Sequence, residues 1–261
     1  MNSTHEGGKL GLALGGGATL GAAHIGVLKA LEEMSIDLHC VSGTSIGAYI
    51  GALYAFGVSP ADIEKEIRGL NWLDVSGLSL QKIKFGLLTN DKLGKSLENR
   101  LGSAQIADSK LPLAIVATDI ASGKKVVLTE GAVSQAVMAS TAVPGIFAPV
   151  EIDDQILVDG GLVENVPISP LQELGADLTI GVNLGAHQSF RKPDDIIDVL
   201  VNSIDIAIDN ATRLQTSKAD IVISPELGAY SRTDSTQISE LIDEGYKAAC
   251  AAISSSDLGT A

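Results

Sequence analysis

The chain has 261 residues, of which 45% are hydrophobic, and this is enough to bury a large core in one domain. Its formal net charge of −14 at pH 7 argues against nucleic-acid binding and against a general attraction to anionic lipid. The sequence has no apolar run near the roughly 18 residues that span a bilayer, and residues 1–6 lack the features of a signal peptide, so we expect a cytoplasmic protein with at most transient contact with a membrane surface.

The first predicted elements are a strand, a glycine-rich loop and a helix. Residues 10–14 form a short apolar run, and residues 22–34 carry apolar side chains at helical spacing. The loop at 15–21 begins with three glycines, so several backbone N–H groups can point into one concavity at the start of the helix. Such a loop can hold an anion, either an oxyanion or the phosphate of a nucleotide.

A dinucleotide site is the competing interpretation of this loop. Asp37 lies about 20 residues beyond the glycines, as that fingerprint requires. However, Leu20 stands in place of the third glycine, and Asp37 begins the next predicted strand instead of ending it. The sequence also lacks the G-x-x-x-x-G-K-[ST] motif of nucleoside triphosphate sites. A nucleotide-binding α/β module remains the minor alternative.

A serine between two glycines follows the second predicted strand, which spans 37–42. The motif Gly43-Thr44-Ser45-Ile46-Gly47 leads directly into a buried helix. A tight strand-to-helix turn would expose the serine hydroxyl, and the helix N-terminus would favour an anion beside it. Ser45 is therefore a candidate nucleophile, while Gly43 and Gly47 allow the turn to pack closely. For this motif alone, the alternative is a serine that caps an ordinary helix.

The rest of the chain alternates between predicted strands and helices. A helix begins at Ser59-Pro60, and residues 70–110 are less regular and could supply a lid or a pocket wall. Further strands are predicted at 113–118, 125–128, 155–158, 178–182 and 220–223, and further helices near 131–140, 194–217 and 236–253. This alternation predicts an α/β fold: one domain in three α/β/α layers around a mainly parallel sheet.

The ends of the chain complete this organisation. We expect 1–8 to be a disordered N-terminal segment, 9–255 to form the folded domain and 256–261 to be a C-terminal tail. The last two predicted helices carry acidic residues, and we expect them to be solvated covering elements or an oligomer contact.

A serine nucleophile requires a base, and Asp159 is the stronger candidate. His24 lies one turn beyond the glycine loop, but an elbow after the second strand does not fit the Ser, acid, His order of α/β-hydrolases, so we expect this histidine to be structural. Asp159 ends a short apolar strand, and Gly160 and Gly161 allow a sharp turn after it. Taken alone, Asp-Gly-Gly indicates only a turn.

Together these motifs resemble the patatin-like phospholipases, in particular the bacterial cytoplasmic members. The resemblance covers most of residues 9–185 and includes the glycine loop with its helix, the Ser45 turn, the Asp159-Gly160-Gly161 motif and the stretches 117–123 and 139–147. It implies a patatin-like α/β fold and a Ser45–Asp159 dyad that works without histidine. It also implies an oxyanion hole, formed by the backbone of Gly16, Gly17 and Ala18.

Two positions depart from the pattern of that family. Ala18 stands where the family often has a glycine, and Leu20 replaces a commonly basic residue, which puts in doubt any preference for an anionic head group. Backbone donors survive at an alanine whose φ and ψ are allowed, so we retain the oxyanion hole.

The resemblance implies hydrolysis of carboxylic esters in phospholipids, lysophospholipids or other fatty acyl esters, without a cofactor or metal. We expect Pro144, Ile146 and Phe147 to border the site of the acyl chain. A non-catalytic regulatory or scaffolding protein that retains the fold is the first alternative, and the nucleotide-binding module is the second. The sequence does not indicate an oligomeric state.

Overall fold

The computed structural model describes residues 8–70, 77–78, 88–187, 192–194, 196–256 and 258. The segment expected to be disordered at 1–8 and the tail expected at 256–261 lie largely outside the described residues. The same holds for residues 71–76 and 79–87 of the stretch expected to supply a lid or pocket wall.

A mainly parallel sheet runs through the centre of the described residues. Its strands are β1 Leu10–Leu14, β2 Cys40–Thr44, β5 Leu113–Asp119, β6 Lys124–Leu128, β7 Val150–Ile152, β8 Gln155–Asp159, β9 Leu178–Val182 and β10 Ile221–Ile223. Their order is β10-β9-β1-β2-β5-β8-β7, with β6 also paired to β5. The strands from β10 to β5 pair in parallel, whereas β6, β7 and β8 pair antiparallel. The short strands β3 Gly77–Leu78 and β4 Leu88–Thr89 form a separate antiparallel pair.

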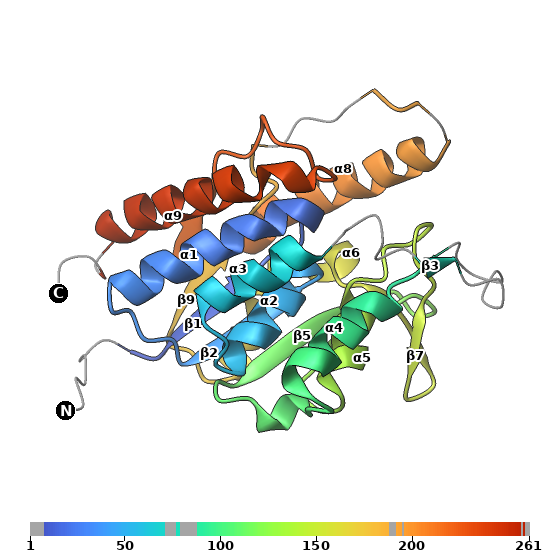
Figure 1. The fold of residues 1–261 in the computed structure, drawn as a ribbon, viewed down its shortest axis with the longest axis horizontal. Coiled ribbons are helices and arrows are strands. Elements are labelled where there is room, and N and C mark those ends of the chain that lie inside the picture. Colours follow the sequence, from blue (N-terminus) through green and yellow to red (C-terminus); the bar gives the residue numbers. More distant parts are fainter. Residues whose placement is uncertain are drawn as a thin grey trace.

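Helices cover both faces of this sheet (Figure 1), which confirms the three-layer α/β/α fold. The main core lies between the sheet and helices α1 Ala22–Glu33, α2 Ile46–Ala55, α3 Pro60–Gly69, α4 Asp91–Leu101, α5 Val133–Ser140 and α9 Ile238–Ser254. A smaller core lies on the opposite face, beside α6 Gly161–Glu164 and α7 Ser169–Glu173. Helix α8, Ile196–Thr216, packs on α6.

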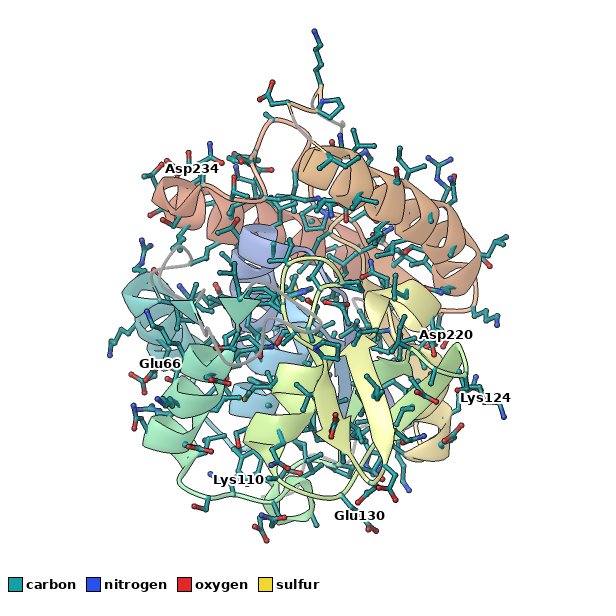
Figure 2. The ribbon with its side chains drawn as sticks, turned by 90° about the vertical axis from the view of Figure 1, so that its right-hand side faces the viewer. Glu66, Lys110, Lys124, Glu130, Asp220 and Asp234 are labelled. Carbon is teal, nitrogen blue, oxygen red and sulfur yellow. The ribbon has the colours of Figure 1, made fainter. Side chains whose placement is uncertain are left out.

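Successive side chains of β1 point alternately into the two hydrophobic cores, on opposite faces of the sheet. Leu12 and Leu14 point into the main core, whereas Ala13 points into the smaller core, where it meets Ile168 and Leu171. Both faces of a central parallel strand are buried, and for this reason β1 reads as a continuous apolar run. The labelled charged residues in Figure 2, by contrast, lie around the outline of the molecule.

Helix α9 packs along α1 at close range. A Cβ added to Gly26 of α1 would lie 1.9 Å from the carbonyl oxygen of Ile242, and one added to Gly245 of α9 would lie 1.9 Å from that of Ala23. The two glycines therefore let the helix backbones touch, and α9 is a packed part of the fold rather than a solvated cover. No helix in the described residues combines the length and apolarity needed to cross a bilayer.

Candidate active site

Ser45 lies between β2 and α2 in a strained turn. Its φ of 55° and ψ of −125° fall where residues other than glycine are rare. The side chain makes no capping hydrogen bond to α2, which argues against a simple helix cap. The Ser45 N–H donates to Ser140 Oγ at 2.9 Å, and that hydroxyl donates to the Val116 carbonyl oxygen at 2.6 Å. Ser140 therefore ties the turn to β5.

The two glycines of the turn are required by close packing. A Cβ on Gly43 would lie 2.5 Å from the carbonyl oxygen of Gly47, and a Cβ on Gly47 would lie 2.1 Å from that of Leu14. Real Cβ atoms do not approach backbone oxygens this closely, so only glycine lets α2 begin against β1. The predicted close packing of the turn is confirmed.

Ser45 and Asp159 are brought together by the register of the sheet. Strands β2 and β8 lie on either side of β5, with Thr44 opposite Val116 and Asp159 opposite Ala117. The two strand ends therefore lie at neighbouring positions along β5. The Ser45 side chain lies near enough to the Asp159 carboxyl to lower its pKa, and the Gly161 N–H donates a hydrogen bond to Asp159 Oδ1 at 2.8 Å.

Burial makes Asp159 a stronger base than an exposed aspartate. Loss of solvation raises the pKa of this carboxyl to about 6, and the nearby charge of Asp205 acts in the same direction. The hydrogen bond from Gly161 and the nearby Ser45 hydroxyl oppose this rise in pKa, because both favour the ionised form. The carboxyl is therefore ionised at neutral pH, yet its affinity for a proton is higher than that of an ordinary aspartate.

The glycine loop presents two backbone N–H groups beside this pair. Gly17 and Ala18 line the same cavity as Ser45 and Asp159, and within the described part of the chain neither N–H has a hydrogen-bond acceptor. The N–H of Gly16 is already engaged, because it donates to both carbonyl oxygens of Asn165. The expected set of three free donors is thus reduced to two in this structure.

His24 contacts the glycine loop through its imidazole ring. Its ring is fully buried, and Nε2 lies 2.8 Å from the carbonyl oxygen of Gly15. Burial lowers the pKa of the ring to about 4, so the imidazole is neutral and must carry its proton on Nε2, since the carbonyl can only accept. Nδ1 has no partner. These contacts agree with the structural role expected for His24.

The cavity over Ser45 and Asp159 has a volume of about 190 Å³ and largely apolar walls. On one side these walls include Pro144 and Ile146, two of the three residues expected to border an acyl site. Phe147 packs against the main hydrophobic core, and its backbone forms a bridge to Leu88. Helix α8 supplies the other side through Val201, Ile204 and Ile208, a contribution that we did not predict from the sequence.

Two acidic residues of α8, Asp205 and Asp209, line the cavity, which corrects the expectation of a solvated acidic face. Asp205 Oδ2 lies 3.1 Å from one terminal nitrogen of Arg232, and Asp209 Oδ1 lies 3.8 Å from the other. All three residues line the cavity, and burial raises the pKa of both carboxyls. Arg232 comes from the loop before α9, and its carbonyl oxygen accepts the N–H of Thr19 in the glycine loop.

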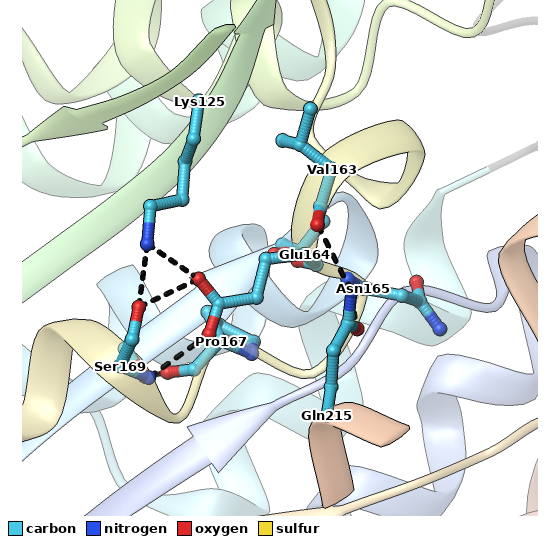
Figure 3. A network of polar contacts seen from close by, with 9 residues as sticks. Lys125, Val163, Glu164, Asn165, Pro167, Ser169 and Gln215 are labelled. Atoms are coloured by element: carbon cyan, nitrogen blue, oxygen red, sulfur yellow. Dashed lines mark hydrogen bonds and ion pairs between the residues drawn. The ribbon is translucent and has the colours of Figure 1, made fainter. Parts of the chain in front are cut away.

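A polar network holds the chain segment that follows Asp159 (Figure 3). The buried Glu164 carboxylate accepts from Lys125 Nζ at 2.8 Å and from the Ser169 hydroxyl at 2.7 Å. Gln215 of α8 accepts the Asn165 N–H at 3.0 Å and donates to the Val163 carbonyl oxygen at 2.9 Å. Asn165 is therefore fixed on both sides, by α8 and by the glycine loop.

Two polar residues of β2 attach to the same segment. The buried hydroxyls of Ser42 and Thr44 donate to the carbonyl oxygens of Pro167 and Glu164, at 2.5 and 2.9 Å. These bonds explain how two hydroxyl side chains are accommodated in a fully buried parallel strand. Among the described residues, no cluster of His, Cys, Asp and Glu has the form of a metal site.

The chain is similar in sequence to a known protein family and to individual relatives. A family model described as "Patatin-like phospholipase" matches residues 12–171. The uncharacterised NTE family protein Mb1092c of Mycobacterium bovis is 34% identical over 183 residues, which cover 69% of this chain and 50% of that protein. The lysophospholipase NTE1 of Pyricularia oryzae is 32% identical over 188 residues, covering 68% of this chain and 12% of its own length. This chain thus spans half or less of these relatives.

Two solved structures share the fold. VipD from Legionella pneumophila superposes with a TM-score of 0.64 at 17% identity, over 96% of this chain and 67% of that chain. The type III effector ExoU superposes with a TM-score of 0.50 at 14% identity, over 95% of this chain and 53% of its own. At these identities the likeness concerns the fold alone.

Proposed function

Since the chain belongs to the patatin-like phospholipase family, we propose that it is a serine acyl hydrolase in which Ser45 and Asp159 form the catalytic dyad. The observation that carries this proposal is the proximity of the Ser45 side chain to the buried carboxyl of Asp159, since both residues line one largely apolar cavity. We propose 9–255 as the extent of the hydrolase domain, because β9, β10, α8 and α9 complete the sheet, the cavity and the main core.

The first half of the reaction acylates the serine. Asp159, as the carboxylate, takes the hydroxyl proton while Ser45 Oγ forms a bond to the carbonyl carbon of the ester. The N–H groups of Gly17 and Ala18 would donate to the oxyanion that develops on the former carbonyl oxygen. As the intermediate collapses, the bond to the alcohol breaks, and Asp159 returns the proton to the departing oxygen.

The second half releases the acid. A water molecule loses its proton to Asp159 and attacks the acyl carbon, and the bond to Ser45 Oγ then breaks as the serine regains a proton from Asp159. The pKa of about 6 places the base closer to the working pH than a solvated aspartate would be. Oxyanion donors of this kind contribute roughly 10²–10³ each in rate, so the glycine loop is an essential part of the proposal.

The walls of the cavity support a fatty acyl ester as substrate. Apolar side chains from the segment 143–146, from Leu162 and from α8 surround the nucleophile, and they would remove an acyl chain from water. The curated relatives named lysophospholipase support lysophospholipids within this class, beside phospholipids and other fatty acyl esters. Carboxylic esters have better leaving groups than amides, which favours them for a dyad with a carboxylate base.

The decisive experiment is covalent labelling with a fluorophosphonate, followed by hydrolysis of p-nitrophenyl esters of increasing chain length. We expect wild-type protein to be labelled and to turn over esters, and we expect Ser45→Ala and Asp159→Asn to reduce kcat by at least about 10³-fold. Ser217→Ala, at an exposed serine on the surface, is the matched control and should retain full activity. A folded wild-type protein that neither labels nor hydrolyses would contradict the proposal and support the scaffolding alternative.

A further inference from the structure

Helix α8 has two apolar sides, and only one of them faces the protein. Val201, Ile204 and Ile208 line the cavity over Ser45. The opposite side exposes large apolar side chains to solvent, and we call this set the α8 stripe: Ile196, Val199, Leu200, Ile206 and Leu214. These are five of the eight large hydrophobic residues that are exposed in the described part of the chain. Exposed apolar surface is therefore concentrated on one helix.

The spacing of the stripe places it on one side of the helix. Its successive members are three, one, six and eight residues apart and cover an arc of about 120° around the axis, and Leu214 lies about five turns beyond Ile196, roughly 27 Å along the axis. Within this arc the exposed polar residues are Ser203 and Asn210, neither of which is charged, and the exposed Arg213 lies at its edge. The Ser203 hydroxyl donates to the Val199 carbonyl oxygen at 2.7 Å, so it already has a partner. A chain with a net charge of −14 thus presents an uncharged apolar arc.

We infer that the α8 stripe docks on a neutral lipid surface and thereby places the cavity next to the lipid that holds its substrate; this inference rests on the proposed function. Helix α8 lies at the outer edge of the molecule in both views (Figures 1 and 2). A helix with an apolar outer side can lie in the plane of a lipid surface, with that side buried about 5–10 Å deep. Because the inner side of the same helix lines the cavity, docking brings the cavity close to the lipid.

Charge and composition favour a lipid surface over a second copy of this chain. Two molecules that each carry a net charge of −14 repel each other, whereas a zwitterionic surface has no net charge to oppose the protein. The stripe is entirely aliphatic and lacks the tryptophan, tyrosine and arginine that dominate most protein interfaces. The net charge also predicts weaker binding to anionic than to neutral lipid.

The test measures flotation with phosphatidylcholine vesicles. The variant Leu200→Ser/Leu214→Ser removes two members of the stripe without touching the cavity, and Ile120→Ser is its matched control. Ile120 lies between β5 and β6 and is 49% exposed, close to the 52% of Leu200. We expect wild type and Ile120→Ser to float with the vesicles and the double variant to bind at least about tenfold more weakly. All three should hydrolyse a short, water-soluble ester at the same rate.

Several results would overturn this inference. Vesicle binding by the double variant equal to wild type would do so, and so would an equal loss in Ile120→Ser. A wild-type dimer in sedimentation velocity that the double variant dissociates would assign the stripe to a second copy instead. Flotation of Ser45→Ala separates the two proposals, because binding through the stripe does not depend on turnover. Vesicle binding without any ester hydrolysis would reject the proposed function and retain the docking surface.

Discussion

Asn165 accepts the N–H of Gly16 through its backbone carbonyl oxygen and through its side-chain Oδ1, at 3.2 Å in each case. The glycine loop after β1 and the segment after Asp159 are thereby joined directly. Gly17 and Ala18, which carry the proposed oxyanion donors, come directly after Gly16 in the chain. Asn165 is thus a positioning residue for the loop rather than a donor of the proposed reaction.

Replacing Asn165 tests this positioning. Asn165→Ala removes Oδ1 and leaves the backbone acceptor, so we expect kcat to fall about fivefold, as the loss of one hydrogen bond of roughly 1 kcal/mol would produce. The KM for a short p-nitrophenyl ester should change little, because Oδ1 contacts the loop and not the acyl chain. Steady-state kinetics give both values. Lower thermal stability with an unchanged kcat would show that the contact serves only folding.

The pKa of Asp159 predicts the pH dependence of the reaction. The base must be ionised, so kcat/KM should fall as the pH drops through about 6. Asp205→Asn removes a negative charge that raises this pKa, and it should therefore move the acid limb to lower pH. Arg232→Gln removes a cation from the same cavity and should move the limb in the opposite direction. Profiles of kcat/KM from pH 4.5 to 8 would measure both shifts, and identical profiles would contradict the assignment of the base.

The same raised pKa predicts a conflict between stability and activity at Asp159. The pKa of the Asp159 carboxyl is near 3.8 in the unfolded chain and about 6 in the folded protein, so the folded protein binds this proton more tightly between these two pH values. The free energy of unfolding therefore decreases as the pH rises through this range, and it stays lower at higher pH, where the carboxyl is ionised in both states. Asp159→Asn, which carries no charge, should stabilise the inactive protein at pH 7.5 by up to about 3 kcal/mol.

Urea unfolding of wild type and Asp159→Asn at two pH values measures this effect. The advantage of the variant should be largest at pH 7.5 and should fade towards pH 4, where both folded and unfolded wild type bind the proton. A variant less stable than wild type at pH 7.5 would show that the carboxylate contributes more through its hydrogen bonds than burial costs it.

The Ser45 turn predicts a severe effect of one added methyl group. Gly47→Ala would place its Cβ 2.1 Å from the carbonyl oxygen of Leu14, so α2 would have to move away from β1. We expect a loss of more than about 3 kcal/mol in unfolding free energy, or no folded protein. Gly69→Ala is the matched control, since a Cβ there meets nothing within 4 Å and should change stability by less than about 1 kcal/mol. Equal stability of the two variants would contradict the packing argument.

The parts of the fold that depend on local signals could be predicted from the sequence. Short apolar runs predict the strands β1 and β9, and the spacing of glycines predicts the glycine loop and the Ser45 turn. Helix α4 escaped prediction because it lies in an irregular, polar stretch, although Leu93 and Leu97 are buried one turn apart. Strand β7 has only three residues, too few for its alternation to show.

The walls of the site could not be predicted in the same way. Helix α8 carries apolar residues on two sides, so its periodicity does not say which side faces the protein. Asn165 and Arg232 reach the glycine loop through contacts between segments far apart in the chain, and no local pattern indicates them. These two contacts form only after the complete fold has brought the segment after β8 and the loop before α9 next to the glycine loop.

Sheet register brings together the strand ends that precede Ser45 and carry Asp159, because β2 and β8 are aligned through the adjacent residues Val116 and Ala117. The wall contributed by α8 has no strand pairing to preserve. Substitutions of its apolar residues Val201, Ile204 and Ile208 would therefore alter which acyl chains fit the proposed site while Ser45 and Asp159 keep their places. Substrate selectivity can change through these three positions without a change in Asp205 or Gln215, the residues of α8 that act on Asp159 and Asn165.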